Sequence, residues 1–304
     1  MGVSVIIPTY NRSNFVTRAI SSVLYQEWHE YEIIVVDDGS TDRTKEKLAV
    51  FGNKIRYISH PYNKGVSAAR NTGIKNAKYS IIAFLDSDDY WLPHKLLTQL
   101  GFFNKMPQAI ACQTQEIWIR NGKRINPKKV HKKLSGDIFI PSLRLCLVSP
   151  SAVMIKREIF EEVGLFDEDM PVCEDYDLWL RISCRYPIYL IDKPLLVKEG
   201  GHKDQLSVKY WGMDRFRIYS LVKLIKSQNL SQDYYRAVIK ELEYKCHIYG
   251  NGCIKRGRPQ EGNFYLNIPR LINKDITTLF LKLKRLLFPL TPSENLVHLV
   301  HHLQ

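Results

Sequence analysis

Two clusters of acidic residues early in the sequence have the spacing of a cation site. Asp86, Asp88 and Asp89 lie within four positions after the apolar run "IIAFL", and "DDGSTD" at 37–42 follows another apolar run. Carboxylates this close repel one another, and each favours protonation unless a cation balances its charge. Their oxygens suit a hard divalent cation such as Mg²⁺ or Mn²⁺, which often binds together with a diphosphate.

Each cluster also has a purely structural interpretation. Acidic residues after a strand often cap the next helix, so "DDGSTD" can be a turn with Thr41 or Asp42 as the N-cap. A single Asp-x-Asp sequence is weak support for a metal site. Two clusters after two strand-like runs favour the cation site, because ligands of α/β sheets bind beyond the carboxyl ends of the strands.

The elements around the clusters alternate between strand and helix patterns. Four runs rich in β-branched residues predict buried strands at 3–8, 31–36, 55–59 and 80–85. Segments with helical periodicity lie at about 13–25, 41–51 and 66–76, and after Pro93, which suits a first helical turn. This order predicts βαβ units and a mostly parallel sheet flanked by helices. Both acidic clusters, and "PTYN" after the first strand, then lie at one edge of the sheet.

After residue 105 the pattern changes. Strands are predicted within 109–120 and at 151–156 and 186–191, and helices near 157–163 and within 174–183. From residue 211 nearly every segment has helical periodicity, at about 213–227, 231–249, 260–267 and 275–288. We therefore expect one α/β domain over 1–210 and a helical C-terminal extension over 211–304.

The composition is that of a soluble globular protein, with 45% apolar and 25% charged residues among 304. A strand pattern begins at Val3, so no signal peptide is expected, and no apolar stretch approaches the roughly 18–20 residues needed to span a bilayer. The six cysteines have no CxxC or zinc-like spacing, which indicates reduced thiols. These features predict a cytoplasmic protein.

The net charge of +13 is unevenly distributed. Residues 201–304 contain 17 Lys or Arg against 8 Asp or Glu, and 120–133 contains seven basic residues and no acid. Basic surfaces can meet nucleic acid, anionic membranes or phosphorylated substrates, and solvated surfaces explain both regions equally well. Nucleic-acid binding would place stacking aromatics among the basic residues, and 120–133 has none, so no nucleic-acid partner is expected.

Four successive motifs resemble those of family 2 glycosyltransferases, which have the GT-A fold. They are "VSVIIPTYNR", "EIIVVDDGSTD", "NKGVSAARNTGIKNA" and "IIAFLDSDDYWLPHKL". The resemblance covers about the first 200 residues in the family's order and spacing. It implies transfer of a sugar from a nucleotide-diphosphate donor with inversion, usually with Mg²⁺ or Mn²⁺. It also makes 1–105 the nucleotide-binding half of the α/β domain and 106–210 the acceptor half.

The resemblance implies roles for residues of the nucleotide-binding half. Asp38 would accept a hydrogen bond from the base of the donor, in a pocket lined by Pro8 and Tyr10, although ordinary packing explains Tyr10 nearly as well. Arg70 in "SAARN" would contact the nucleotide base or a phosphate, and its other interpretation is a surface arginine. Asp86 would hold the ribose or water molecules around the metal.

The same resemblance implies a metal ligand and a general base. Asp88 would bind the cation and bridge it to the diphosphate. His202 in "GGHKDQLS" would bind metal or diphosphate, with Lys203 as a neighbouring candidate. The Glu-Asp pair of "CEDYDLWLR" makes Asp175 the base that deprotonates the acceptor hydroxyl. Helix capping also explains acids in a first turn, and Asp177 is a weaker candidate for the base.

The expected function is inverting, metal-dependent glycosyl transfer from a nucleotide-sugar donor to a glycan or lipid-linked acceptor, in assembly of a bacterial surface polysaccharide or similar glycoconjugate. The segment 275–290 has an apolar stripe with Lys and Arg largely elsewhere. It either packs on the protein's own helices or associates peripherally with the inner face of the cytoplasmic membrane. A nucleotidyltransferase would need a glycine-rich, Lys-containing loop that "PTYNRSNF" lacks. A catalytically inactive nucleotide-sugar-binding protein is the other alternative.

Overall fold

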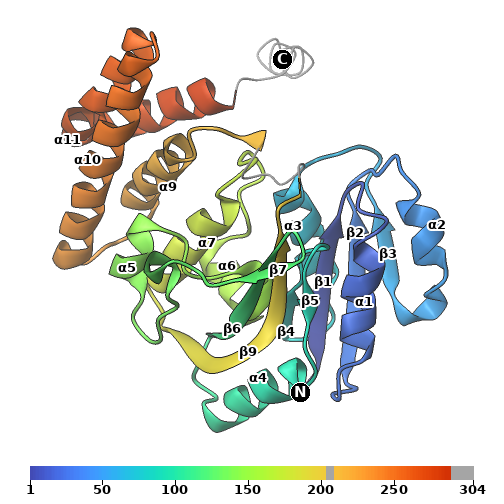
Figure 1. Cartoon of the computed structure of the whole chain (residues 1–304). Coiled ribbons are helices and arrows are strands. Elements are labelled where there is room, and N and C mark those ends of the chain that lie inside the picture. The colour runs from blue at the N-terminus through green and yellow to red at the C-terminus, as the bar shows by residue number, and fades with distance from the viewer. Residues whose placement is uncertain (203–208, 289–304) are drawn as a thin grey trace, which may run out of the picture. The chain divides into compact units, whose positions relative to one another are not determined.

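The computed structural model describes residues 1–202 and 209–288. The chain folds as two compact units, Met1–Lys209 and Tyr210–Gln304 (Figure 1). The first unit contains the sheet, and the second contains only helices and connecting turns among its described residues.

Within the described residues, nine strands form one sheet in the first unit. They are β1 (Val3–Thr9), β2 (Tyr31–Asp37), β3 (Arg56–Ser59), β4 (Ile81–Phe84), β5 (Tyr90–Trp91), β6 (Ala111–Arg120), β7 (Lys123–Ile125), β8 (Val153–Lys156) and β9 (Ile188–Gly200). Their order across the sheet is β3-β2-β1-β4-β8-β6-β9-β5, and β7 pairs with β6.

The first four strands run parallel, and the rest of the sheet is mixed. β1 lies between β2 and β4, with Thr9 opposite Asp37, and β2 pairs with β3 in the same direction. β8 runs antiparallel to both β4 and β6, whereas β9 runs parallel to β6 and bends strongly along it (Figure 1). The predicted α/β fold is confirmed, and the carboxyl ends of β1, β2 and β4 share one edge.

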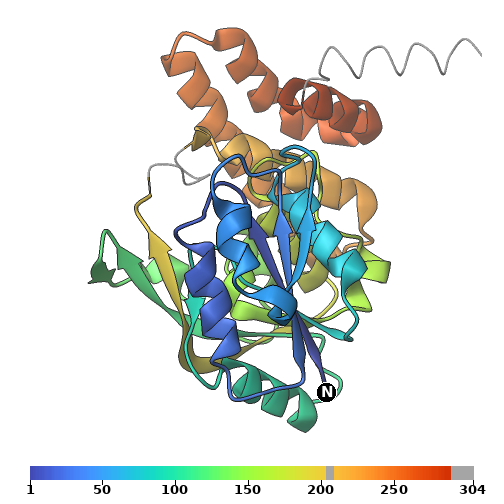
Figure 2. The same ribbon diagram turned by 90° about the vertical axis from the view of Figure 1, so that its right-hand side faces the viewer.

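Helices cover both faces of the sheet. They are α1 (Val16–Leu24), α2 (Thr44–Ala49), α3 (Val66–Asn76), α4 (Lys95–Lys105), α5 (Phe139–Arg144), α6 (Ile159–Val163) and α7 (Glu174–Ser183), with short 3-10 turns at Gly52–Lys54, Lys129–His131 and Pro150–Ala152. Alternation along the buried strands puts Val5 in one apolar cluster, with α1, α2 and α4, and Ile6 in the opposite cluster, with α3, α6 and α7. Figure 2 shows α1 and α3 on opposite sides of β1 and β2.

Two elements differ from the sequence expectation. β9 continues to Gly200, well beyond its predicted end at 191, because it pairs with β6 as far as Arg120 despite Asp192, Lys193 and Pro194. α4 begins at Lys95 and not at Pro93, because the intervening His94 has a left-handed φ of 67°.

The second unit contains α9 (Asp214–Ser227), α10 (Gln232–Lys255) and α11 (Pro259–Leu287). Ser231 caps α10, since its hydroxyl accepts a hydrogen bond from the Tyr234 N–H at 3.3 Å. α11 joins the two helices predicted at 260–267 and 275–288 across a kink at Asp275, where φ is −157° and ψ is 90°.

The apolar stripe of 275–290 packs inside the second unit over its described part. Leu279 and Leu283 are buried, and the Phe280 ring stacks on Tyr219 of α9 with ring centroids 5.2 Å apart. Of the two interpretations of this stripe, packing on the protein's own helices is therefore the one observed. None of the helices in the described parts of the chain is long and apolar enough to cross a membrane.

Candidate active site

The loops after β1 and β2 are bonded to each other at the edge of the sheet. The Asp38 N–H donates to the Thr9 carbonyl at 2.9 Å, which continues the β1–β2 pairing past Asp37. Asn11, in a left-handed conformation with φ of 50°, accepts from the Thr41 N–H at 2.8 Å through its side-chain oxygen. "PTYN" and "DDGSTD" thus meet at one edge of the sheet.

Asp38 is buried and holds the loop that leads into α3. Its carboxylate accepts from the N–H groups of Lys64 and Gly65 at 2.9 and 2.8 Å, and it bonds the His60 ring at 2.7 Å. His60 in turn bonds the Thr72 hydroxyl at 2.9 Å. The contact predicted between Asp38 and a donor base stays a prediction, and His60 is a buried partner that the motifs did not reveal.

Pro8 and Tyr10 lie at the same edge with different exposure. Pro8 is buried within β1, whereas Tyr10, directly after β1, is 43% exposed. The Tyr10 ring is therefore not a core side chain, which weighs against the packing interpretation. The predicted contact of both residues with the donor base stays a prediction.

Arg70 of α3 is a buried cation that joins two parts of the first unit. One Nη donates to Glu174 Oε1 at 2.6 Å and the other donates to Asp86 Oδ1 at 2.8 Å. Burial lowers the pKa of Arg70, but the two carboxylates outweigh it and hold that pKa above its ordinary value. Arg70 is not a surface residue, and it connects the acidic cluster after β4 with the start of α7.

The three carboxylates after β4 have different surroundings. Asp89 is buried and accepts from the Glu199 N–H at 3.0 Å, which anchors β9. The Asp88 carboxylate lies 3.8 Å from the Arg12 guanidinium. Burial and then the charge of Asp86 raise the pKa of Asp88, and burial and then Asp88 raise the pKa of Asp89 well above its usual range. A cation would stabilise the ionised form of each, so this cluster fits a divalent ion.

His202 lies beside the cluster with one ring nitrogen unbonded. Its Nε2 is buried without a hydrogen-bond partner, its ring packs edge-on against Phe15 at 4.5 Å, and its charge opposes the raised pKa of Asp88. Within residues 1–202 and 209–288, no three Asp, Glu, His or Cys side chains form a closed metal site. Mg²⁺ commonly binds one or two carboxylates and completes its coordination with substrate phosphates and water, so the Asp88 carboxylate fits such an ion, and the metal contact of His202 stays a prediction. Lys203 lies outside the described residues.

Asp175 lies in the first turn of α7 and keeps access to solvent. Its Oδ1 accepts from the Tyr176 N–H at 2.7 Å, and its Oδ2 lies 3.6 Å from the Cys146 sulfur. The neighbouring Glu174 is buried, and burial and the charge of Asp175 raise the pKa of Glu174 to about 7 against the opposing effect of Arg70. Asp175 is therefore the acid of this pair that is accessible to a substrate.

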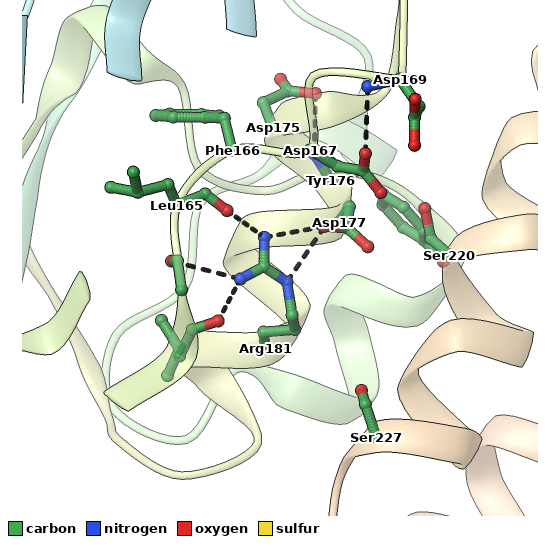
Figure 3. A network of polar contacts seen from close by, with 12 residues as sticks. Leu165, Phe166, Asp167, Asp169, Asp175, Tyr176, Asp177, Arg181, Ser220 and Ser227 are labelled. Atoms are coloured by element: carbon green, nitrogen blue, oxygen red, sulfur yellow. Dashed lines mark hydrogen bonds and ion pairs between the residues drawn. The ribbon is translucent and has the colours of Figure 1, made fainter. Parts of the chain in front are cut away.

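Asp177 is buried and has a structural partner (Figure 3). Its carboxylate pairs with Arg181 at 2.8 Å. Arg181 also donates to the carbonyls of the segment that ends α6, namely Val163, Gly164 and Leu165. The Asp177–Arg181 pair thus fixes the segment between α6 and α7, and the weaker candidacy of Asp177 as the base stays a prediction.

Two charged side chains near this site were not found from the sequence. Glu116 of β6 pairs with Lys133 at 3.0 Å, and Lys198 of β9 donates to the Ser149 hydroxyl at 3.2 Å. Burial lowers the pKa of Lys198, but four carboxylates, led by Glu116 and including Asp175, outweigh it and raise that pKa. Lys198 lies beyond the predicted end of the last strand, and no motif marks it.

Comparisons with known proteins show the family of this chain. Residues 4–164 match the family model for glycosyl transferase family 2. The Escherichia coli protein UDP-Glc:alpha-D-GlcNAc-diphosphoundecaprenol beta-1,3-glucosyltransferase WfgD is 35% identical over 185 residues, which are 59% of this chain and 69% of the relative. An uncharacterized glycosyltransferase of Rickettsia bellii is 38% identical over 214 residues, 68% of this chain and 31% of the relative. The chain spans about a third of the length of three such Rickettsia proteins and 65% of two others.

Solved structures resemble the chain in fold. S. aureus TarS 1–349 in complex with UDP has a TM-score of 0.63 at 21% identity, over 80% of this chain and 71% of that one. Mannosyltransferase PcManGT from Pyrobaculum calidifontis, in complex with GDP-Man and Mn²⁺, has a TM-score of 0.58 at 17% identity, over 99% of this chain and 79% of that one. The likeness shows a curled mixed sheet flanked by helices with a helical C-terminal region.

Proposed function

The chain belongs to glycosyl transferase family 2, and on this premise we propose that it transfers a sugar with inversion from a nucleotide-diphosphate donor to an acceptor hydroxyl. The observation that carries the proposal is the Arg70 bridge. Arg70 binds Asp86, which belongs to the cluster predicted to hold the donor, and Glu174, which directly precedes the predicted base. Donor and acceptor chemistry would therefore meet around one buried guanidinium.

In this proposal Asp88 and His202 would hold Mg²⁺ or Mn²⁺, and Asp86, fixed by Arg70, would bind the ribose. When bound, the ion supplies positive charge that stabilises the departing nucleoside diphosphate. The raised pKa values of Asp88 and Asp89 support a divalent ion beside them, because its charge would stabilise their ionised forms.

The donor base would lie against the loops after β1 and β2. Tyr10 is the exposed side chain there, Pro8 is buried within β1, and Asp38 holds the neighbouring loop through Lys64 and Gly65. The contacts of Asp38 fix this loop before a nucleotide enters, which would reduce the ordering cost of binding.

Asp175 is the general base of the proposed reaction. Its Oδ1 is held by the Tyr176 N–H, so Oδ2 accepts the proton of the acceptor hydroxyl. As the proton leaves, the acceptor oxygen bonds to the anomeric carbon, and the bond from that carbon to the diphosphate oxygen breaks. Glu174 is less suited than Asp175 to meet the acceptor hydroxyl, because it is buried and its Oε1 accepts a hydrogen bond from Arg70.

We propose UDP-glucose as the first donor to test and a lipid-linked sugar diphosphate as the acceptor class, because the relative WfgD is named for these substrates. An acceptor of this class would place the reaction at the cytoplasmic face of a membrane, in assembly of a bacterial surface polysaccharide. The second unit suits such a surface, since residues 210–288 contain 15 Lys or Arg against 6 Asp or Glu.

A donor screen with two variants tests this function. Nucleoside diphosphate release would be measured from UDP-glucose, UDP-N-acetylglucosamine and GDP-mannose, with Mn²⁺ and a short-chain synthetic GlcNAc-diphosphate lipid. Asp88→Ala should remove the Mn²⁺ dependence of UDP binding. Asp175→Asn should keep UDP binding while transfer falls about 10²- to 10⁴-fold, the usual contribution of a general base.

Asp42→Ala is the matched control for the metal role. Asp42 belongs to the other acidic cluster and lies two residues before α2, where its carboxylate accepts from the Thr44 N–H at 3.0 Å. This variant should leave the Mn²⁺ dependence unchanged. Full transfer by Asp175→Asn would contradict the base assignment, and Mn²⁺-independent binding of UDP by the unaltered protein would contradict the role of Asp88.

A further inference from the structure

Arg18 of α1 binds two segments that lie far apart in the sequence. One Nη donates to the backbone carbonyl of Asp88 at 2.8 Å, and the other lies 2.6 Å from Glu199 Oε2. The guanidinium also lies over the Tyr90 ring, 4.5 Å from the ring centre. A planar guanidinium presents its N–H donors in fixed directions, so it can hold two partners in one geometry. Arg18 therefore connects the loop after β4 with the last residues of β9.

The segment that Arg18 holds lies beyond the pairing of β5 with β9, which ends at Tyr90 and Val197. Past that pair, the Asp89 carboxylate accepts from the Glu199 N–H at 3.0 Å, and Arg18 binds the Glu199 carboxylate. Glu199 is thus bound to the nucleotide-binding half through both its backbone and its side chain. These two contacts fix the end of β9 beside the acidic cluster.

The turns before Arg18 contact both predicted metal ligands. Arg12 lies 3.8 Å from the Asp88 carboxylate, and the Phe15 ring packs edge-on against the His202 ring at 4.5 Å. The Phe15 N–H donates to the Arg12 carbonyl at 2.9 Å, and the Arg18 N–H donates to the Phe15 carbonyl at 3.0 Å. Residues three apart in such helical turns are neighbours on one side. Arg12, Phe15 and Arg18 therefore form one surface, which contacts Asp88 and His202.

We propose that Arg18 is a positioning residue for the metal site: it ties the Asp88 loop to the end of β9, so that Asp88 and His202 stay together beside α1. This inference rests on the proposed glycosyl transfer, which assigns both residues to the ion. Segments that are fixed in advance need not be ordered when the ion and the nucleotide bind, which favours binding. Arg18 itself carries a positive charge and does not bind the cation.

Manganese binding tests this role without catalysis. The electron paramagnetic resonance signal of free Mn²⁺ would be titrated with protein in saturating UDP. Arg18→Met removes the donors to Asp88 and Glu199 and should weaken Mn²⁺ binding about 10- to 100-fold, the usual cost of losing a group that orients a metal ligand. Arg18→Lys keeps the charge without the planar fork and should recover part of this loss. Unchanged Mn²⁺ affinity in Arg18→Met would overturn the proposal.

A second substitution tests whether Arg18 acts through Glu199. Glu199→Gln keeps an acceptor oxygen and removes the charge that Arg18 binds. The double variant Arg18→Met with Glu199→Gln should bind Mn²⁺ as weakly as Arg18→Met alone, because changes to partners in one contact do not add. Losses that add in the double variant would show that Glu199 acts on the ion independently of Arg18, and they would contradict the proposed link.

Arg56→Met is the matched control. Arg56 is the first residue of β3, at the end of that strand away from the acidic cluster, and it donates to the Asn76 carbonyl and side-chain oxygens at 2.8 and 2.7 Å. Arg18 is 40% exposed, so its ion pair contributes little to overall stability. Both variants should melt within about 4 °C of the unaltered protein, and Arg56→Met should keep its Mn²⁺ affinity. Equal losses of Mn²⁺ affinity in the two variants would refute a specific role of Arg18.

Amide hydrogen exchange without metal or nucleotide separates this inference from the proposed function. The Glu199 N–H, which donates to Asp89, should exchange about 10-fold faster in Arg18→Met and at the unaltered rate in Arg56→Met. An unchanged rate in Arg18→Met would show that Arg18 does not hold the end of β9, and the proposal would fail. If the unaltered protein binds no Mn²⁺ and transfers no sugar, the proposed function fails, while exchange at Glu199 still decides whether Arg18 fixes this segment.

Discussion

Asp175 and Asp177 lie two residues apart on α7, and their surroundings give them different chemistry. Asp177 is buried and bound to Arg181, so its negative charge is balanced by that guanidinium inside the protein. Asp175 keeps one oxygen, Oδ2, near the Cys146 thiol and open to a further partner. A first helical turn tolerates both acids because its unpaired N–H groups favour negative charge. Access, more than residue type, therefore separates the candidate base from its neighbour.

Lys95 gives a prediction about stability at the residue scale. It is fully buried at the start of α4, donates to the Ala152 carbonyl at 3.3 Å and to Gln99, and burial lowers its pKa to about 7 from 10.5. Between these two values the unfolded chain binds more protons than the folded chain, so this residue makes stability rise with pH from about 7 to 10.5. Below pH 7 Lys95 is protonated in both the folded and the unfolded chain, and burial of its charge then lowers the free energy of unfolding most.

Lys95→Met should therefore be more stable than the unaltered protein at pH 7, and the difference should shrink by up to about 1.4 kcal/mol per pH unit toward pH 9. Urea unfolding at several pH values measures this difference. Lys105→Met, at the exposed end of the same helix, is the control and should show no such trend. A constant difference between Lys95→Met and the unaltered protein would show that Lys95 does not change protonation on folding.

Local patterns made part of the site predictable. The acidic clusters and the Glu-Asp pair were predictable because each is a short motif attached to a strand end or a helix start. The Arg70–Glu174 pair was not, since 104 positions separate its members and no period of the sequence links them. Lys198 was hidden for a similar reason, because its partners come from β6, α7 and the loop after β4.

At the scale of elements, buried parallel strands were the most predictable part of the fold. β1, β2 and β4 are apolar on both faces, so their runs are continuous and their ends are marked by polar residues. β9 was predicted too short because Asp192, Lys193 and Pro194 interrupt its pattern, although pairing with β6 resumes after a register shift. Tertiary pairing thus extended a strand that its own residues do not mark.

The crossing of α10 and α11 gives a prediction at this scale. Gly250 and Gly262 are buried where the helices meet, and a Cβ on Gly262 would lie 2.6 Å from the Gly250 carbonyl oxygen. Gly262→Ala should lower the free energy of unfolding of the second unit by about 1–3 kcal/mol. The added methyl group would overlap the backbone of α10, so α10 and α11 would have to move apart. Urea unfolding followed through the fluorine-19 signal of labelled Trp211, the single tryptophan of this unit, measures the change.

Gly252→Ala is the matched control on α10. Its Cβ would meet only the end of the flexible Arg256 side chain at 3.0 Å, and replacing a helical glycine by alanine reduces the entropy lost on folding. This variant should stabilise the unit by roughly 0.5–1 kcal/mol. Equal effects of the two substitutions would show that the helices do not meet closely at Gly262.

At the scale of the whole molecule, the chain combines an α/β unit with a strongly basic helical unit. The charge of the second unit predicts salt-sensitive binding to phosphatidylglycerol vesicles and little binding to phosphatidylcholine vesicles. Lys282→Gln with Arg285→Gln removes two exposed charges of α11 and should weaken partitioning by about 10- to 30-fold, at about 1 kcal/mol per charge. Vesicle sedimentation at 50 and about 500 mM salt measures this. Binding that persists at high salt would point to apolar insertion and contradict a charge-driven association.

The Arg70 bridge also has a consequence for the order in which the protein is made. A ribosome adds the 104 residues between Arg70 and Glu174 in roughly 5–20 s at about 5–20 residues per second. During that interval the guanidinium has Asp86, 16 positions later, as a partner, and its second carboxylate does not yet exist. The edge of β4 that pairs with β8 likewise stays unpaired until β8 has been synthesised. The nascent N-terminal half therefore emerges with one partner of Arg70 missing and an open strand edge, and the last third of the same unit supplies both partners.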